Sequence, residues 1–152
     1  MSTFNSILVP TDFSAASGHA LEIGIELASK LDARLTVAHF WEVPPYPYFG
    51  IVGEWDFVTP IGEAAEKQLA SAFMQVQQRL PHATSICRMG SPWQEILRVI
   101  EEVHADLVVM GTHARRGLSH ALLGSVAEKI VRTSPVPVLT VQAREGEEGS
   151  SR

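Results

Sequence analysis

The chain has 152 residues, of which 45% are hydrophobic and 19% are charged, a balance typical of one globular domain with a buried core. Its net charge of −5 at pH 7 excludes the broadly basic surface that nucleic-acid binding requires. A single cysteine, Cys87, excludes an internal disulfide and is typical of a reducing compartment. The sequence has neither a readable signal peptide nor a segment long enough to span a bilayer, so we expect a cytoplasmic protein with no membrane partner.

Strand and helix patterns alternate along the chain. The strands are short apolar runs, whereas the helices have apolar residues three or four positions apart on one face. In chain order we expect a strand at residues 7–9, a helix at 14–31, a strand at 35–38, a helix at 60–80, a strand at 84–89, a helix at 92–103, a strand at 107–110, a helix at 125–131 and a strand at 136–141. This order predicts an α/β fold, a single open five-stranded parallel sheet with helices on both faces, which is Rossmann-like.

Local residue patterns predict where several helices begin. Thr59 followed by Pro60 is typical of a helix cap and a first helical residue. Residues 91–94, Ser-Pro-Trp-Gln, and residues 125–128, Ser-Val-Ala-Glu, both have the pattern of a capping box. We expect residues 1–141 to form one domain and residues 142–152 to form a disordered polar tail.

Residues 41–58 interrupt the alternation with a long segment rich in proline and aromatic residues. Loops of this length in compact domains are often functional. The composition indicates a semi-rigid, partly buried segment. It is either a packed surface flap, or a lid or partner-docking surface.

The segment from Val108 to Val126 gives the clearest indication of chemistry. An apolar strand continues into a loop that contains glycines and basic residues, and the loop ends at Gly124 and Ser125 where a helix begins. Glycines let backbone N–H groups approach an anion closely, and a helix N-terminus adds free donors and a positive dipole end. We therefore expect this loop to bind the phosphates of a nucleotide, although Gly124 also fits a simple turn.

A second loop, residues 10–14, follows the first strand. In open parallel sheets, ligands bind beyond the carboxyl ends of the strands, at the point where the strand order reverses. If the first and fourth strands are neighbours at that point, both loops face one crevice. Asp12 then accepts hydrogen bonds from a ribose hydroxyl or holds Mg²⁺ through water; the alternative role is a cap for the helix that begins near Ser14.

Other conspicuous residues have structural interpretations. The six histidines lack the spacing of a metal site, and Cys87 is expected to pack within a strand. The apolar stripe that begins at Trp93 is expected in the core. Arg115 and Arg116 either contact phosphate or belong to a solvated loop.

Four segments resemble the universal stress protein family: residues 7–14, 89–92, 111–126 and 134–139. The resemblance extends over roughly residues 4–141. The nucleotide-binding branch of that family has a glycine, two residues, a second glycine, nine residues, and then Gly-Ser or Gly-Thr. Gly111, Gly124 and Ser125 match this spacing, whereas Ala114 replaces the middle glycine.

The resemblance implies an adenine-nucleotide α-hydrolase-like fold that binds ATP, AMP or ADP, with or without Mg²⁺. It implies that Asp12 lies by the ribose or adenine, that Phe40 and Gly90 lie near the base, and that the start of the last helix holds the phosphates. The expected binding residues are Pro10, Thr11, Asp12, Phe40, Gly90, Met110, Gly111, His113, Ala114, Arg115, Gly117, Gly124, Ser125 and Val126. The resemblance also implies a homodimer through the strand Val136–Val141, whose apolar sheet edge invites pairing although Pro137 removes one donor.

We expect a stress-response regulatory protein that binds an adenine nucleotide and acts through nucleotide-dependent contact with a protein partner that the sequence does not name. The alternative is a dimeric interaction protein of the same fold that binds no nucleotide. An enzyme, at most a slow ATPase, has less support. Phosphoryl transfer needs an oriented nucleophile as well as a phosphate site, and the sequence has no Gly-Lys-Ser P-loop and no evident base beside the phosphates.

Overall fold

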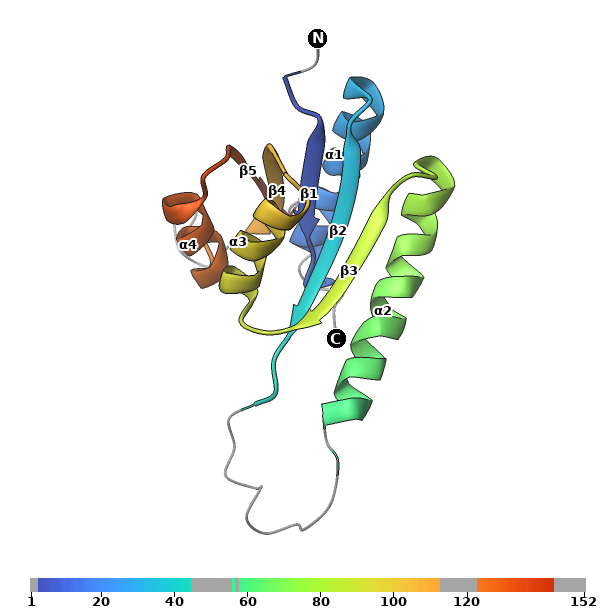
Figure 1. Ribbon diagram of the computed structural model, residues 1–152, viewed down its shortest axis with the longest axis vertical. Coiled ribbons are helices and arrows are strands. Elements are labelled where there is room, and N and C mark those ends of the chain that lie inside the picture. Colours follow the sequence, from blue (N-terminus) through green and yellow to red (C-terminus); the bar gives the residue numbers. More distant parts are fainter. Residues whose placement is uncertain (1–2, 45–55, 57, 113–122, 144–152) are drawn as a thin grey trace.

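The computed structural model describes residues 3–44, 56, 58–112 and 123–143. Strands and helices alternate through this part of the chain (Figure 1). In order they are β1 (Ser6–Pro10), α1 (Ala15–Leu31), β2 (Arg34–Trp41), α2 (Val58–Arg79), β3 (Thr84–Met89), α3 (Pro92–Glu102), β4 (Leu107–Thr112), α4 (Ser125–Thr133) and β5 (Val138–Gln142). The strands form one parallel sheet in the order β3-β2-β1-β4-β5, which confirms the expected fold class.

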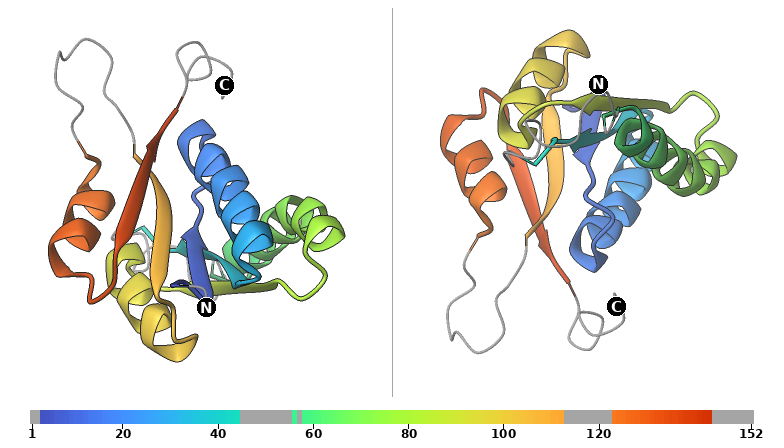
Figure 2. Two further views of the ribbon diagram at one scale, coloured as in Figure 1. Left: turned by 90° about the horizontal axis from the view of Figure 1, so that it is seen from above. Right: turned by 90° about the horizontal axis from the view of Figure 1, so that it is seen from below.

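Helices cover both faces of the sheet, α1 and α2 on one face and α3 and α4 on the other (Figure 2). The central strand β1 is buried along its whole length. Because side chains alternate between the faces of a strand, Ile7 and Val9 pack toward α1 and α2, whereas Leu8 packs toward α3 and α4. Burial on both faces explains why β1 and β4 are continuous apolar runs in the sequence.

The strand order reverses between β1 and β4. From β1 the chain continues outward to β2 and β3, and it then returns to the other side of β1 to form β4 and β5. The carboxyl ends of β1 and β4 therefore flank the reversal, as the expected crevice requires. The loop after Pro10 and the end of β4 at Thr112 meet at this edge.

Three strand predictions were too short. Residues 7–9 lie within β1, which also includes Ser6 and Pro10 because both pair with β2. Residues 35–38 are the middle of β2, which extends from Arg34 to Trp41 because its last residues continue to pair with β3. Likewise β4 continues past Met110 to Thr112, where it still pairs with β5.

The last strand begins later than expected, at Val138 instead of Val136. The Ser134 hydroxyl oxygen accepts a hydrogen bond from Val136 N–H (3.2 Å) and donates one to the Val136 carbonyl (2.7 Å). Both backbone groups of Val136 are therefore hydrogen-bonded to the Ser134 side chain, and Pro137 has no N–H to donate. β5 also includes Gln142, one residue beyond the expected domain end; the tail from residue 144 lies outside the described residues.

Helix α2 begins at Val58, so Thr59 lies inside the first turn and is not its cap. Asp56 Oδ1 accepts hydrogen bonds from the N–H groups of Val58 (3.0 Å) and Thr59 (3.1 Å). Hydrogen bonds from the Thr59 side chain and backbone, and from Val58, hold the pKa of Asp56 below its usual value. Most of the segment 41–58, for which a flap or lid was considered, lies outside the described residues.

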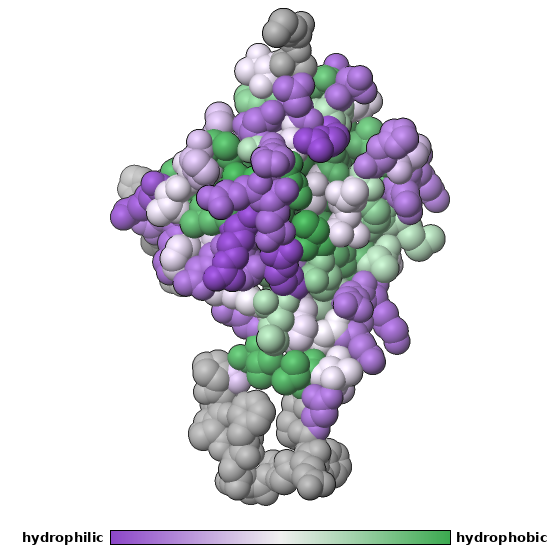
Figure 3. All heavy atoms as spheres, viewed as in Figure 1, coloured by the Kyte–Doolittle hydropathy of each residue, from purple (hydrophilic) through white to green (hydrophobic). Residues whose placement is uncertain are grey.

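A charged cluster joins β3 to α3. Glu95 is buried at 5% exposure, and its carboxylate contacts Arg98 and also Arg88 (3.4 Å). Arg88 forms two further hydrogen bonds of 2.8 Å with Glu102, which raise the pKa of Arg88 and lower that of Glu102. Hydrophilic side chains gather over this part of the surface (Figure 3).

No helix among the described residues combines the length and the apolar character that crossing a bilayer requires.

Candidate functional site

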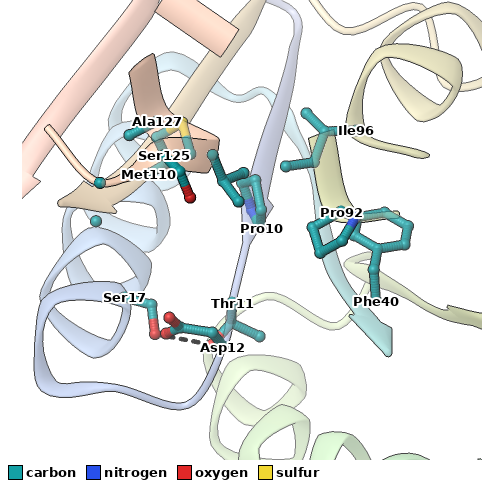
Figure 4. A pocket seen from close by; sticks show the side chains of 13 residues that line it. Pro10, Thr11, Asp12, Ser17, Phe40, Pro92, Ile96, Met110, Ser125 and Ala127 are labelled. Carbon is teal, nitrogen blue, oxygen red and sulfur yellow. Dashed lines mark hydrogen bonds between the residues drawn. The ribbon is translucent and has the colours of Figure 1, made fainter. Parts of the chain in front are cut away.

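A cavity of about 260 Å³ opens at the carboxyl ends of β1 and β4 (Figure 4). This volume is just below the roughly 300–1,000 Å³ typical of small-molecule sites. The described residues that line the cavity are Pro10, Thr11, Asp12, Ser17, Phe40, Pro92, Ile96, Met110, Gly111, Gly124, Ser125, Val126 and Ala127. The structure thus brings together residues from both loops and from the start of α4.

One wall of the cavity is apolar. Phe40 at the end of β2 and Pro92 and Ile96 in the first turns of α3 lie together on this side (Figure 4). Phe40 is 8% exposed and Ile96 is 1% exposed, so both are fixed by the core. A flat apolar group of a ligand can pack against this wall, because the wall has no polar side chain that would lose its hydrogen bonds to water.

The opposite wall is polar and comes from the loop between β1 and α1. Thr11, Asp12 and Ser17 lie together there (Figure 4). The Thr11 and Ser17 hydroxyl oxygens are hydrogen-bonded at 3.1 Å, and both side chains belong to buried residues. Asp12 is exposed, and its Oδ1 accepts a hydrogen bond from Ser14 N–H (3.0 Å).

The alternative role proposed for Asp12, a cap of α1, is wrong. The N-cap residue is Ser14, whose hydroxyl oxygen accepts a hydrogen bond from Ser17 N–H at 3.3 Å. Asp12 closes a local turn just before the helix. A serine two residues along could do the capping because Ser and Asp are about equally good N-caps.

Helix α4 begins at the cavity. Gly124 is its N-cap and Ser125 is its first residue, so the cap position has no side chain that could accept a hydrogen bond from the first N–H groups. The capping box expected at Ser125 is therefore wrong, and Glu128 pairs with Arg132 (2.8 Å). The first N–H groups of a helix have no acceptor within the helix, and residues 124–127 line the cavity, so an anion bound there can accept from them.

The capping box expected at the start of α3 is also only partly present. Ser91 is the N-cap and Pro92 is the first helical residue, as predicted, but the Ser91 side chain makes no capping hydrogen bond. The apolar stripe of α3 packs in the core as expected. In addition, the Lys129 ammonium group lies 4.6 Å from the centre of the Trp93 ring, which ties α4 to α3.

The two glycines of the motif differ in what the fold demands of them. A Cβ at Gly111 would lie 2.5 Å from the backbone of Ala16 and Ser17, so close packing of β4 against α1 requires glycine there. Among the described residues, a Cβ at Gly124 would meet no atom within 4 Å, and the backbone angles of Gly124 (φ −60°, ψ 162°) suit any residue. Within the described residues, packing does not require glycine at position 124, and glycine is one of several residues that helix N-caps favour.

Gly90 is the described member of the predicted set that does not line the cavity. Its φ of 154° favours glycine, and a Cβ there would lie 2.6 Å from the Glu95 side chain. Gly90 N–H donates to the Trp41 carbonyl (2.9 Å). Its position is explained by the turn between β3 and α3.

The remaining predicted residues, His113, Ala114, Arg115 and Gly117, lie outside the described residues, as does Arg116.

The sequence reasoning missed Ser17, Pro92, Ile96 and Ala127, which also line the cavity. Each lies in the first or second turn of a helix that starts at this edge of the sheet. A signal for them was present, because the first turns of all helices that follow β1, β3 and β4 must lie near the carboxyl edge. To select the cavity residues from these first turns, the strand order would have been needed in advance.

Cys87 lies in β3 and does not line the cavity. Cys87 is partly buried and packs against the core, as predicted, and burial, with a smaller contribution from Glu66, raises the pKa of its thiol. Within residues 3–44, 56, 58–112 and 123–143, no three His, Cys, Asp or Glu side chains are grouped to hold a metal ion.

The parallel sheet, its reversal and the cavity beside a helix start define an open α/β protein with a ligand-sized site at the carboxyl edge. A model of the universal stress protein family matches residues 3–142. The chain is 31% identical over 147 residues to universal stress protein YxiE of Bacillus subtilis, and the match covers 91% of this chain and 99% of YxiE. The chain belongs to the universal stress protein family.

Solved structures share the fold. UspA from Lactobacillus plantarum superposes with a TM-score of 0.75 at 22% identity, covering 93% of this chain and 99% of that one. A universal stress protein in complex with cAMP gives 0.70 at 21% identity, covering 94% and 100%. One from Arabidopsis thaliana with AMP bound gives 0.64 at 18% identity, covering 97% of each chain.

Proposed function

We propose that the cavity binds an adenine nucleotide, and that the protein acts in the stress response by contacting a partner protein in a nucleotide-dependent way. The observation that carries the proposal is Gly124. A glycine that the described fold does not require stands at the start of a helix that opens on the cavity. Close approach of a phosphate group to backbone N–H groups is a sufficient reason for it.

The two walls of the cavity match the two halves of a nucleotide. The base would lie against Phe40, Pro92 and Ile96, where no polar side chain has to be desolvated. The phosphates would lie at the start of α4, where N–H groups and the helix dipole favour negative charge. Asp12 would accept a hydrogen bond from a ribose hydroxyl or hold Mg²⁺ through water.

Relatives of the same fold support the choice of adenine nucleotides. One was solved in complex with cAMP and another with AMP bound. AMP, ADP and ATP share the base, the ribose and the first phosphate. Nucleotide released from the purified protein and identified by mass spectrometry would decide among them.

Titration calorimetry with ATP, ADP and AMP, each with Mg²⁺, tests the proposal directly. Asp12→Ala should weaken binding, and Asp12→Asn should retain part of it because an amide oxygen still accepts a hydrogen bond. If Asp12 only orders its loop through Ser14, Asp12→Ala lowers thermal stability by about 1 kcal/mol and leaves the affinity unchanged.

A second test of nucleotide binding uses Ala114, at the position where the family pattern has glycine. Ala114→Gly should tighten ATP binding by roughly 5- to 30-fold if that position needs a left-handed backbone. If the wild type and Ala114→Gly both fail to bind all three nucleotides at millimolar concentration, the nucleotide proposal is wrong. The dimeric interaction protein then takes its place.

A homodimer through the free edge of β5 is the second part of the proposal. Val108 N–H donates to the Pro137 carbonyl (3.0 Å), so the backbone groups of Pro137 point toward β4. Because these groups alternate along a strand, the N–H that Pro137 lacks is not one that a partner needs. The residues whose backbone groups point away from β4 are Val138, Thr140 and Gln142.

Antiparallel pairing of two β5 strands is most complete when it is centred on Thr140. In that register every outward N–H and C=O of one strand faces its counterpart on the other, and Leu139, which is 40% exposed, lies opposite the partner's Val141. Thr140→Pro removes one outward donor but leaves the ladder to β4 intact. It should give a monomer by light scattering at tens of micromolar, whereas Thr140→Val stays dimeric; a monomeric wild type contradicts the proposal.

A further inference from the structure

His39 contacts the Asp12 loop from the face of the sheet that α1 and α2 cover. In β2, Ala38 and Phe40 pack toward α3 and α4, so the alternation of side chains places His39 on the face of α1 and α2. His39 does not line the cavity. Its Nδ1 nevertheless lies 2.8 Å from the Thr11 carbonyl oxygen.

The same ring also supports an unusual backbone. Phe13 has φ 65°, a left-handed conformation that a bulky side chain adopts only when its surroundings hold it there. The rings of Phe13 and His39 lie with their centres 4.4 Å apart at 45°. The Thr11 hydroxyl oxygen accepts a hydrogen bond from Phe13 N–H (3.1 Å), so the loop is fixed on both sides of Asp12.

The hydrogen bond has a defined direction. The Thr11 carbonyl can only accept, so His39 Nδ1 must bear the hydrogen. That carbonyl belongs to the peptide group that joins Thr11 to Asp12, and Thr11 N–H is itself bonded to the Ala38 carbonyl (2.8 Å). Fixing this peptide plane fixes the direction in which the Asp12 side chain leaves the backbone.

We infer that His39 is a positioning residue for nucleotide binding, which acts through Asp12 by holding the Thr11 carbonyl and the Phe13 ring. The inference rests on the proposed nucleotide function. His39 itself does not line the cavity. Its contribution to affinity depends on Asp12 being present.

Two substitutions separate the contacts of His39. His39→Phe keeps a ring beside Phe13 but removes the donor, whereas His39→Asn offers an amide N–H near the position of Nδ1. We expect His39→Phe to weaken ATP binding about 3- to 10-fold and His39→Asn to restore most of the affinity. His82→Phe is the matched control, because His82 is exposed and does not line the cavity. This variant should bind ATP like the wild type.

A double-mutant cycle with Asp12→Ala tests whether His39 acts through Asp12. In the Asp12→Ala background, His39→Phe should cause no further loss of ATP affinity. Independent, additive losses overturn the inference, as does a His39→Phe variant that binds like the wild type. If the wild type binds no ATP, ADP or AMP, the proposed function and this inference fall together; additive losses in a binding protein remove the inference alone.

A second measurement needs no nucleotide. Long-range ¹H–¹⁵N spectra distinguish the two ring nitrogens of a histidine, and we expect Nδ1 of His39 to carry hydrogen. This signature should persist in Asp12→Ala. A ring with hydrogen on Nε2 alone would show that the bond to Thr11 is not made, and would overturn the inference whatever the binding data.

Discussion

Gly124 offers the most direct test of where the phosphates lie. We consider Gly124→Asp and Gly124→Asn, which have nearly the same shape and differ in charge. Both residues are good N-caps and are better than glycine by a few tenths of a kcal/mol. A Cβ at Gly124 would meet no atom of the described residues within 4 Å, so both variants should fold with an unchanged or slightly raised thermal midpoint.

The two variants should differ in nucleotide affinity. We take a separation of about 5 Å between a carboxylate at position 124 and a phosphate held by the first N–H groups of α4. At an effective dielectric constant of about 20, two unit charges at this separation repel by about 3 kcal/mol. This corresponds to roughly 150-fold weaker binding for Asp than for Asn. The asparagine variant loses affinity only through its bulk.

Calorimetric titration with ATP at low and high salt measures the effect, and a melting curve for each variant controls for folding. The ratio of the two affinities should shrink as salt is added, because ions screen the repulsion. Equal affinities for Gly124→Asp and Gly124→Asn would refute the reasoning and would place the phosphates away from α4.

Three further predictions concern stability. Gly111→Ala should cost about 1–3 kcal/mol in urea unfolding, because its methyl group meets the α1 backbone at 2.5 Å; an unchanged midpoint would contradict the packing role. Arg88→Met should cost about 1.5–3 kcal/mol because it leaves buried Glu95 with Arg98 as its remaining partner, and wild-type stability would refute this. The folded pKa of Asp56 is lowered from 3.8, so its contribution is complete above that value and is lost as the pH falls through the folded pKa. The gap between the wild type and Asp56→Asn should therefore close toward acid; a constant gap would argue against the first-turn hydrogen bonds.

Most of the fold could be predicted from the sequence because its signals are local. The apolar runs of β1 and β4 and the stripe on α3 each follow from burial on known faces. Two of the errors occur where a side chain forms a hydrogen bond with a backbone group. Asp56 bonds the first N–H groups of α2 and moves its start to Val58, and Ser134 occupies Val136 and delays β5. Such bonds depend on side-chain orientation, which a residue pattern does not specify.

Some residues of the candidate site could be identified from the sequence, and others could not. The loop residues after β1 and β4 could be chosen from the sequence, because glycine, aspartate and serine at strand ends are recognisable. Their partners across the cavity could not, since Ile96 looks like any other core residue until the strand order brings α3 to the same edge. His39 illustrates the limit: its bond to the Thr11 carbonyl joins β2 to the end of β1, and no spacing along the chain encodes that contact.

The spacing of Gly111 and Gly124 suggested one cause, the approach of phosphate, for both residues. The packing around the two glycines differs and indicates different reasons for them. Gly111 is fixed by α1, which would exclude any side chain whether or not a ligand is present. A Cβ at Gly124 would meet none of the described residues, and the backbone angles are ordinary, so a side chain there would disturb whatever occupies the cavity before it disturbed the described fold. A glycine that packing requires supports the fold alone, and a glycine that packing leaves unexplained is the stronger argument for a ligand.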